Sequence, residues 1–346
     1  DNSMAMGCCN VINKSEYSQI AGGCKNFITG STTFTNGLNN IVGGCGNLLH
    51  GDISFGSTDV KNEGNVILGG SKNTASGDHN SILGGRCNIL KGKESNIAGG
   101  LENEANGIQN SIGGGCCNII LSADVGTIGG GDKNQINTGN YSTIVGGRGN
   151  CLTNSPDSVA GGKNNYITET SQSAIAGGVD NCILATGSIS SGSVVISGGE
   201  ENIISNHNGS ATIGGGEKNT IKDGAKGSII GGGYGNCISG SVFGTIGGGF
   251  ENQILLPLPN CTQDSLFDGI QGGDIIAGGS CNKIFIISQS LFAKPGGNTI
   301  AGGAFNTLQN QLFSYVHGFC NKIEARPVIG IGNPNLNVVN QILGGS

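Results

Sequence analysis

Cysteine is the residue type with the greatest chemical potential in this sequence, which has 13 cysteines among its 346 residues. Most of the cysteines directly follow a glycine or lie one residue further on. Thiols at matching positions of neighbouring repeats could form disulfides within or between chains. They could equally pack as small apolar side chains, so both interpretations stay open. The set concerned is Cys8, Cys9, Cys24, Cys45, Cys87, Cys116 and Cys117.

The other residue types that could serve catalysis or bind metal are dispersed. His50, His79, His207 and His317 lack the spacing of a metal site, and acidic residues such as Glu102 occur singly. Glycoside hydrolysis needs a pair of carboxylates, and calcium-binding glycine repeats need aspartate where this chain has asparagine. We therefore expect no catalytic residue, no metal site and no cofactor, and we predict that the chain is not an enzyme.

These residues belong to a repeat that covers nearly the whole chain. The segments SQIAGGCKNFI (Ser18 to Ile28), NSILGGRCNIL (Asn80 to Leu90) and NTIAGGAFNTL (Asn298 to Leu308) share the template x-I-x-G-G-x-x-N-x-I. Eighteen copies can be aligned on the asparagine, from Asn10 to Asn321, and twelve of the seventeen steps between them are 15–17 residues. A fixed period of this length is the signature of a repeat architecture.

Each repeat is predicted to contain two short strands, I-x-G and N-x-I, joined by a tight corner. Side chains alternate along a strand, so the asparagine and isoleucine of N-x-I should share one face. Glycine allows the corner to adopt positive φ and to approach a neighbouring backbone closely. Coils of this kind stack on their copies. We predict an all-β fold, a parallel β-solenoid (β-roll) of about 18–19 coils with roughly 15–16 residues each.

Two columns of side chains should run along such a stack. The asparagine amides are expected to bond to the coils above and below and to cap the corner. The predicted ladder comprises Asn26, Asn88, Asn103, Asn118, Asn134, Asn150, Asn165, Asn181, Asn219, Asn236 and Asn252. The predicted core comprises Ile20, Ile82, Ile97, Ile112, Ile128, Ile144, Ile175, Ile213, Ile230 and Ile246.

Composition excludes several other classes of protein. Glycine supplies 68 residues, proline only 6, and charged residues 12%, with a net charge of −6. Long helices are disfavoured because glycine costs about 1 kcal/mol per helical position relative to alanine, and collagen is excluded by the scarcity of proline. The absence of a basic run argues against nucleic acid, and no apolar stretch reaches the roughly 18–20 residues of a membrane helix.

The predicted core is thin, which favours association of several chains. Each coil buries two or three aliphatic side chains at about 1.5–3 kcal/mol apiece, while ordering its backbone costs roughly 1–2 kcal/mol per residue. We therefore expect a homo-oligomer, and further fibre segments at both ends of the chain. Residues 1–254 are predicted to be regular solenoid, and residues 255–346 a continuation with longer coils and insertions, because five of the six prolines lie there.

The repeat resembles the head repeats of YadA-like trimeric autotransporter adhesins. The matching stretches are SAIAGG (Ser173 to Gly178), SNIAGG (Ser95 to Gly100) and SIIGGG (Ser228 to Gly233). The resemblance implies a left-handed β-roll, three chains about one axis and a role in surface adhesion. The chain departs from that family in its thirteen cysteines, and we expect neither a membrane anchor nor a coiled-coil stalk. These departures favour a related viral or phage fibre.

The sequence thus predicts a structural fibre or adhesin segment, a rigid trimeric rod on a virion or cell surface. Its expected partners are further copies of itself and a receptor or glycan on a host surface. One alternative is a tailspike-like solenoid that binds or cleaves carbohydrate. Another is a monomeric, calcium-dependent solenoid.

Overall fold

The computed structural model describes residues 3–30, 37–50, 64–153, 157–159, 161–168, 172–184, 193–205, 209–256, 273–285, 297–309, 314–324 and 341–343. The chain is an all-β parallel solenoid of about 16 coils with about 16 residues each, which confirms the predicted fold class and coil length. It divides into two compact units, Asp1–Asn164 and Asn165–Ser346. The change predicted at residue 255 adjoins the segment 257–272, which lies outside the described residues.

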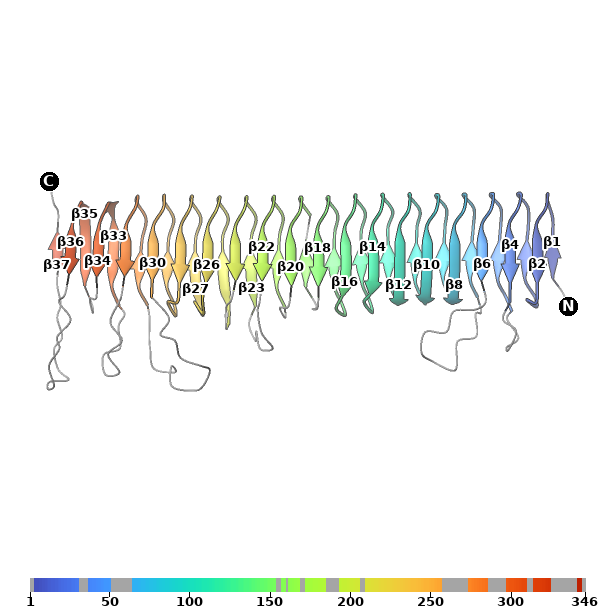
Figure 1. Ribbon diagram of the computed structural model, residues 1–346, viewed down its shortest axis with the longest axis horizontal. Coiled ribbons are helices and arrows are strands. Elements are labelled where there is room, and N and C mark those ends of the chain that lie inside the picture. The colour runs from blue at the N-terminus through green and yellow to red at the C-terminus, as the bar shows by residue number, and fades with distance from the viewer. Residues whose placement is uncertain are drawn as a thin grey trace. The chain divides into compact units, whose positions relative to one another are not determined.

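Within each unit the odd-numbered strands form one sheet, sheet 1, and the even-numbered strands form the other, sheet 2 (Figure 1). Each strand pairs in parallel with the matching strand of the next coil. For example, Ile128 of sheet 1 pairs with Ile144, and Ile136 of sheet 2 pairs with Leu152. Identical positions of successive coils therefore lie directly beside one another.

The first unit contains strands β1 to β19. Its sheet 1 consists of β1 (Met4–Ala5), β3 (Gln19–Ile20), β5 (Asn40–Ile41), β7 (Val66–Ile67), β9 (Ser81–Ile82), β11 (Asn96–Ile97), β13 (Ser111–Ile112), β15 (Thr127–Ile128), β17 (Thr143–Ile144) and β19 (Ser158–Val159). Its sheet 2 consists of β2 (Val11–Asn13), β4 (Phe27–Thr29), β6 (Leu48–His50), β8 (Thr74–Asp78), β10 (Ile89–Lys93), β12 (Glu104–Ile108), β14 (Ile119–Ser122), β16 (Gln135–Thr138) and β18 (Cys151–Thr153).

The second unit contains strands β20 to β37. Its sheet 1 consists of β21 (Ala174–Ile175), β23 (Val194–Ile196), β25 (Ala211–Ile213), β27 (Ser228–Ile230), β29 (Thr245–Ile246), β31 (Ile275–Ile276), β33 (Thr299–Ala304), β35 (Tyr315–Phe319) and β37 (Gln341–Leu343). Its sheet 2 consists of β20 (Tyr166–Thr168), β22 (Cys182–Leu184), β24 (Ile203–Ser205), β26 (Thr220–Lys222), β28 (Cys237–Ser239), β30 (Gln253–Leu255), β32 (Lys283–Phe285), β34 (Thr307–Gln309) and β36 (Lys322–Glu324).

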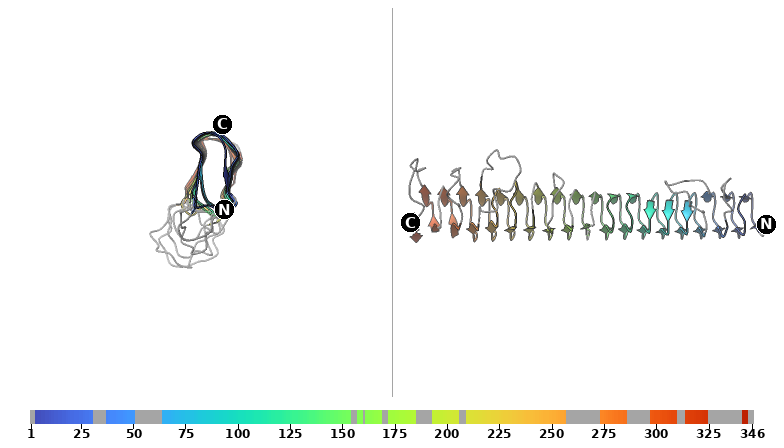
Figure 2. Two further views of the ribbon diagram at one scale, coloured as in Figure 1. Left: turned by 90° about the vertical axis from the view of Figure 1, so that its right-hand side faces the viewer. Right: turned by 90° about the horizontal axis from the view of Figure 1, so that it is seen from below.

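A narrow core separates the two sheets of each unit, whose strands lie on opposite sides of every coil (Figure 2). One isoleucine from each sheet fills the coil, as Ile128 and Ile136 do, and both are fully buried. The asparagine two residues before the second isoleucine is buried as well, here Asn134. Alternation along the strand places Asn134 and Ile136 on the inner face, while Gln135 between them is half-buried.

Candidate functional site: the asparagine ladder and its corner

The corner after each pair of glycines brings successive coils into backbone contact. In one representative coil, Gly115 has φ +88°, and a Cβ placed on it would lie 2.1 Å from the carbonyl oxygen of Gly131 in the next coil. Only glycine combines that conformation with so close an approach. Cys117, just before the asparagine, also adopts a left-handed conformation, with φ +58°. The two residues together turn the chain sharply inward to Asn118.

Each buried asparagine connects three successive coils through hydrogen bonds. The Nδ2 of Asn118 donates to Oδ1 of Asn103 at 3.1 Å, to the carbonyl of Gly114 at 2.9 Å and to that of Gly131 at 3.0 Å. Its Oδ1 accepts from the backbone N–H of Asn134 at 3.0 Å and from Asn134 Nδ2 at 3.1 Å. The side chain thereby uses its donors and its acceptor on its own corner and on both neighbouring coils.

The residues of the predicted ladder occupy equivalent places within the two units. All eleven are fully buried. The same side-chain contact to the preceding coil joins, for example, Asn181 to Asn165 at 3.1 Å and Asn252 to Asn236 at 3.1 Å. The pattern extends to further asparagines that the ladder prediction omitted: Asn47, Asn73, Asn202, Asn282 and Asn306.

The ten isoleucines predicted for the core end the strands of sheet 1 and are at most 1% exposed. They stack in register from coil to coil, as Ile97 does on Ile112. The second strand contributes an opposing column that includes Ile28, Leu90 and Ile120. The isoleucine columns and the asparagine ladder together fill the interior at the corner end of each coil.

A second buried polar column, which sequence reasoning missed, runs along the opposite corner of the coils. It occupies the position two residues before the core isoleucine, for instance Asn80, Ser95 and Asn110. Asn80 Oδ1 accepts from the N–H of Ser95 at 3.1 Å, and Ser95 Oγ accepts from the N–H of Asn110 at 3.0 Å. The signal was a recurrent Asn, Ser or Asp at this position. It was obscured because the residue type varies and the corner differs in length.

Asp274 is the charged member of this second column. Its Oδ1 accepts from the N–H and the Nδ2 of Asn298, at 3.0 and 2.9 Å. Its Oδ2 is buried with no hydrogen-bond partner among the described residues. Burial raises the pKa of this carboxyl above its usual range, against the opposing effect of the two bonds from Asn298.

The predicted cysteines lie at the rim of the glycine corner and not in the core. Cys8, Cys24 and Cys45 are bridge partners on successive coils, and the Sγ atoms of Cys24 and Cys45 are 2.9 Å apart. That interaction raises the pKa of the Cys24 thiol. Cys9 lies beside Cys8, with 3.5 Å between the sulfurs. All seven predicted cysteines are free thiols, half-buried or exposed: Cys8, Cys9, Cys24, Cys45, Cys87, Cys116 and Cys117.

Cys116 and Cys117 lie near Asp132, and their ligand atoms form the one group within the described ranges that is close enough to hold a metal ion. The interaction with Cys116, followed by burial and the nearby charges of Cys116, Glu102 and Asp132, raises the pKa of Cys117 to about 11. The histidines do not belong to this group, and His207 lies outside the described residues.

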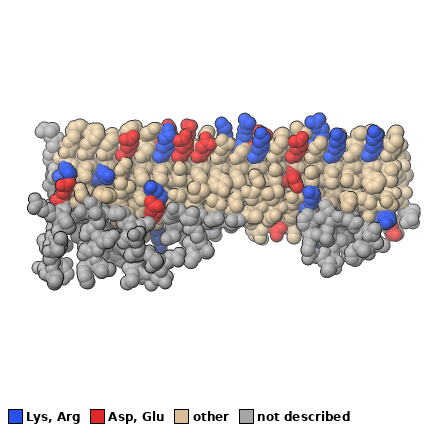
Figure 3. Space-filling view, viewed as in Figure 1, with Lys and Arg blue, Asp and Glu red and all other residues tan. Residues whose placement is uncertain are grey.

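Charged side chains gather along the glycine corner, at the upper edge of Figure 3. Successive coils carry charges of both signs there, and Arg148 Nε lies 3.2 Å from Asp132 Oδ2. In the second unit the same corner carries aromatic rings. Tyr234 and Phe250, on successive coils, stack with their centroids 5.3 Å apart.

Comparisons with known proteins do not assign the chain to a family. No protein-family model matches it, and no curated protein matches it either. Within the described residues, no helix has the length and apolar character needed to cross a membrane. The observed β-solenoid agrees with the fold that the resemblance to adhesin head repeats implied, while membership of that family stays a prediction.

Proposed function

We propose that the chain is a structural protein, a rigid segment of a fibre or adhesin on a virion or cell surface. The observation that supports this proposal best is the asparagine ladder. In each unit the most regular buried polar groups are bonded to neighbouring coils and are therefore committed to holding the stack together. A side chain such as Asn118, with all its hydrogen-bonding atoms engaged in the fold, serves cohesion and not catalysis.

We further propose that copies of the chain associate through sheet 1. The described strands of this sheet contain no Asp, Glu, Lys or Arg, whereas those of sheet 2 contain several. Beside sheet 1, Met6, Val42, Leu68 and Leu83 occupy matching positions of the first unit and are 44–51% exposed. Contiguous exposed apolar surface of this kind marks interaction sites, and depletion of charge is typical of interface cores.

The occupant that fits this surface best is another copy of the chain. A copy presents the same uncharged face with the same spacing between coils, so side chains of the two faces can interdigitate at regular intervals. A left-handed trimer, as in the adhesins that the repeat resembles, satisfies three such faces about one axis. The fibre would hold out an attachment function toward a host receptor or glycan.

A pair of matched leucine variants tests the location of this interface. Leu83→Glu places a charge beside sheet 1, and Leu121→Glu places the same charge on β14 of sheet 2, where the leucine is also exposed. Sedimentation velocity should show dissociation of the oligomer for Leu83→Glu alone. Equal sedimentation of the two variants and the unaltered chain would contradict association through sheet 1.

Carbohydrate binding is a second candidate, favoured by the aromatic rings on the corner of the second unit. Tyr234 and Phe250 are 36% and 45% exposed, and Lys218 Nζ lies 5.4 Å from the centre of the Tyr234 ring. Aromatic rings with a nearby polar group suit amphipathic ligands such as sugars. Binding of the full chain to immobilised glycans should fall in Phe250→Ala and persist in Phe243→Ala, whose ring is also exposed, at 56%, but lies outside the stacked pair. Equal binding by both variants would exclude this site.

A further inference from the structure

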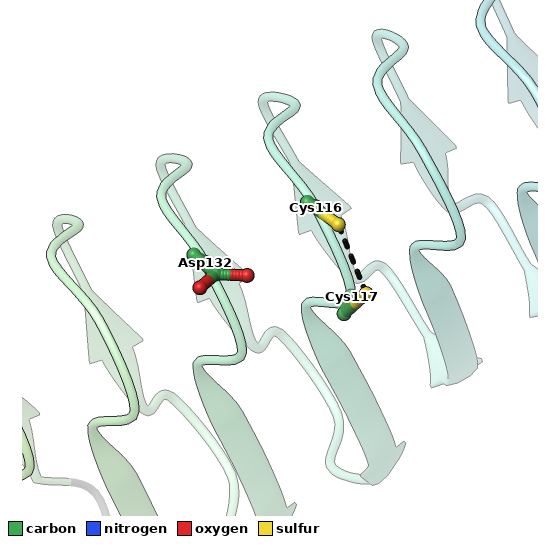
Figure 4. Close-up of side chains that lie close together, drawn as sticks. All are labelled: Cys116, Cys117 and Asp132. Carbon is green, nitrogen blue, oxygen red and sulfur yellow. Dashed lines mark hydrogen bonds between the residues drawn. The ribbon is translucent and has the colours of Figure 1, made fainter.

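Two consecutive thiols and a carboxylate meet on the glycine corner of the first unit. Cys116 and Asp132 are bridge partners on neighbouring coils, so their side chains lie next to one another. The Sγ atoms of Cys116 and Cys117 are 2.9 Å apart. Figure 4 shows Asp132 extending toward the coil that carries both cysteines. One ligand atom from each of the three residues lies within 4.8 Å of the other two.

The preceding coil places a second carboxylate beside Cys117. Oε2 of Glu102 lies 3.9 Å from Cys117 Sγ. The coil of Glu102 and the coil of the cysteines are joined by the bond from the Cys117 N–H to the Leu101 carbonyl, at 2.9 Å. Glu102 therefore lies beside Cys117 but outside the group of ligand atoms that are all within 4.8 Å of one another.

The ion pair between Arg148 and Asp132 leaves one oxygen of the Asp132 carboxylate available to a metal ion. Arg148 Nε pairs with Oδ2 of Asp132, and the arginine side chain is largely exposed. Oδ1 of Asp132 is not used in that pair. An exposed ion pair of this kind contributes only about 0–1 kcal/mol, so it offers little competition to a divalent cation.

We propose that Cys116, Cys117 and Asp132 bind a thiophilic divalent cation such as Zn²⁺, with water as the fourth ligand. Cysteine thiolates and carboxylates are established zinc ligands, and tetrahedral coordination with Zn–S bonds of about 2.3 Å places two sulfurs about 3.7–3.8 Å apart. The two sulfurs need to separate by less than about 1 Å from their present positions to reach that distance, which small side-chain rotations on the half-buried corner can supply. The thiols lose their protons to solvent as the metal binds.

The bound cation would cross-link neighbouring coils of one chain. This function is independent of fibre assembly. The cation would connect side chains from the two neighbouring coils that carry Cys116 and Asp132. A ligand that binds the folded chain and not the unfolded chain stabilises the fold. Metal would therefore stiffen this part of the first unit.

Protection of the thiols from alkylation tests the site directly. The full chain is reduced with a phosphine, treated with a maleimide with and without Zn²⁺, and digested with trypsin. The tryptic peptide that follows Lys93 and ends at Lys133 contains Cys116 and Cys117 and no other cysteine, so its labelling reports this site alone. One equivalent of Zn²⁺ should slow its alkylation by about tenfold or more, because the thiolate is both the nucleophile and the metal ligand, so bound metal withdraws it from the maleimide.

Two matched carboxylate variants distinguish the proposed site from non-specific binding by thiols. Asp132→Asn keeps the shape of the side chain, and it should require at least about tenfold more Zn²⁺ for the same protection. Asp180→Asn alters an exposed carboxylate of the second unit and should behave like the unaltered chain. The proposal is overturned if Zn²⁺ leaves the alkylation rate of this peptide unchanged, or if Asp132→Asn is protected at the same Zn²⁺ concentration as Asp180→Asn.

Discussion

Replacing one rung of the asparagine ladder should destabilise the first unit far more than replacing an exposed asparagine of a neighbouring coil. Asn118→Ala removes a fully buried side chain whose NH2 group contacts three acceptors and whose oxygen accepts two hydrogen bonds. The matched control is Asn96→Ala, which alters an exposed asparagine on β11. If the ladder holds the coils together, only the first substitution should matter.

The expected magnitude follows from the bonds that are lost. The backbone N–H of Asn134 loses its acceptor while it stays buried, at a cost of about 1–3 kcal/mol. The two N–H groups of the amide, shared among three acceptors, also lose their bonds, each with a net contribution of about 0.5–1.5 kcal/mol. The carbonyl of Gly131 keeps a bond from the Cys116 N–H at 2.9 Å, which limits the loss. We expect Asn118→Ala to lower the free energy of unfolding by about 3–5 kcal/mol, near the upper end for single substitutions.

Urea unfolding followed by far-ultraviolet circular dichroism measures this change, because the chain has no tryptophan for fluorescence. Hydrogen exchange adds a local readout, since the amide of Asn134 should lose protection in Asn118→Ala. A repeat protein can open locally, and the exchange rates would reveal such opening even without global unfolding. Stability and Asn134 protection that match those of Asn96→Ala would refute the idea that the ladder holds the stack together.

Three further substitutions probe other parts of the account. Gly85→Ala should prevent normal stacking, because its Cβ would lie 2.2 Å from a backbone oxygen at φ +85°, whereas Gly84→Ala meets open space; circular dichroism melting of the two variants should differ clearly. Ile128→Ala should cost about 2–5 kcal/mol in urea unfolding, and Val11→Ala, on β2 of sheet 2 and 44% exposed, about 0.5 kcal/mol or less. Because the pKa of Asp274 is raised, the folded state binds the proton of this carboxyl more tightly than the unfolded state does. The protonated side chain therefore stabilises the fold at low pH, and this contribution to the free energy of unfolding is lost as the pH rises from about 4 through the raised pKa. Asp274→Asn should therefore stabilise the chain at pH 7, by about 1–3 kcal/mol, and the gain should vanish in acid; a gain that is equal at both pH values would contradict this assignment.

The repeat allowed the fold to be predicted because its two most regular positions are also the two buried columns. Ile128 and Asn134 recur at fixed spacing, and each depends on a neighbour of the same type in the next coil. The second polar column was missed because Asn, Ser and Asp can all accept the same backbone N–H, as Asn80 and Ser95 do. A column that tolerates several residue types has no fixed letter in the sequence template of the repeat.

The proposed metal site could not be predicted from spacing along the chain. Cys117 and Asp132 are separated by nearly a full coil and become neighbours only when the coils stack. Their proximity depends on the register between strands, which a sequence motif does not record. The rim position of the cysteines was equally hidden, because a small thiol suits a buried column and an exposed corner alike.

The native mass of the chain in solution tests the central claim most directly, measured by light scattering with and without reductant. The account predicts a trimer of three times 34.6 kDa, about 104 kDa, in both conditions. A well-folded monomer of 34.6 kDa would contradict both the association through sheet 1 and the proposed role as a fibre segment.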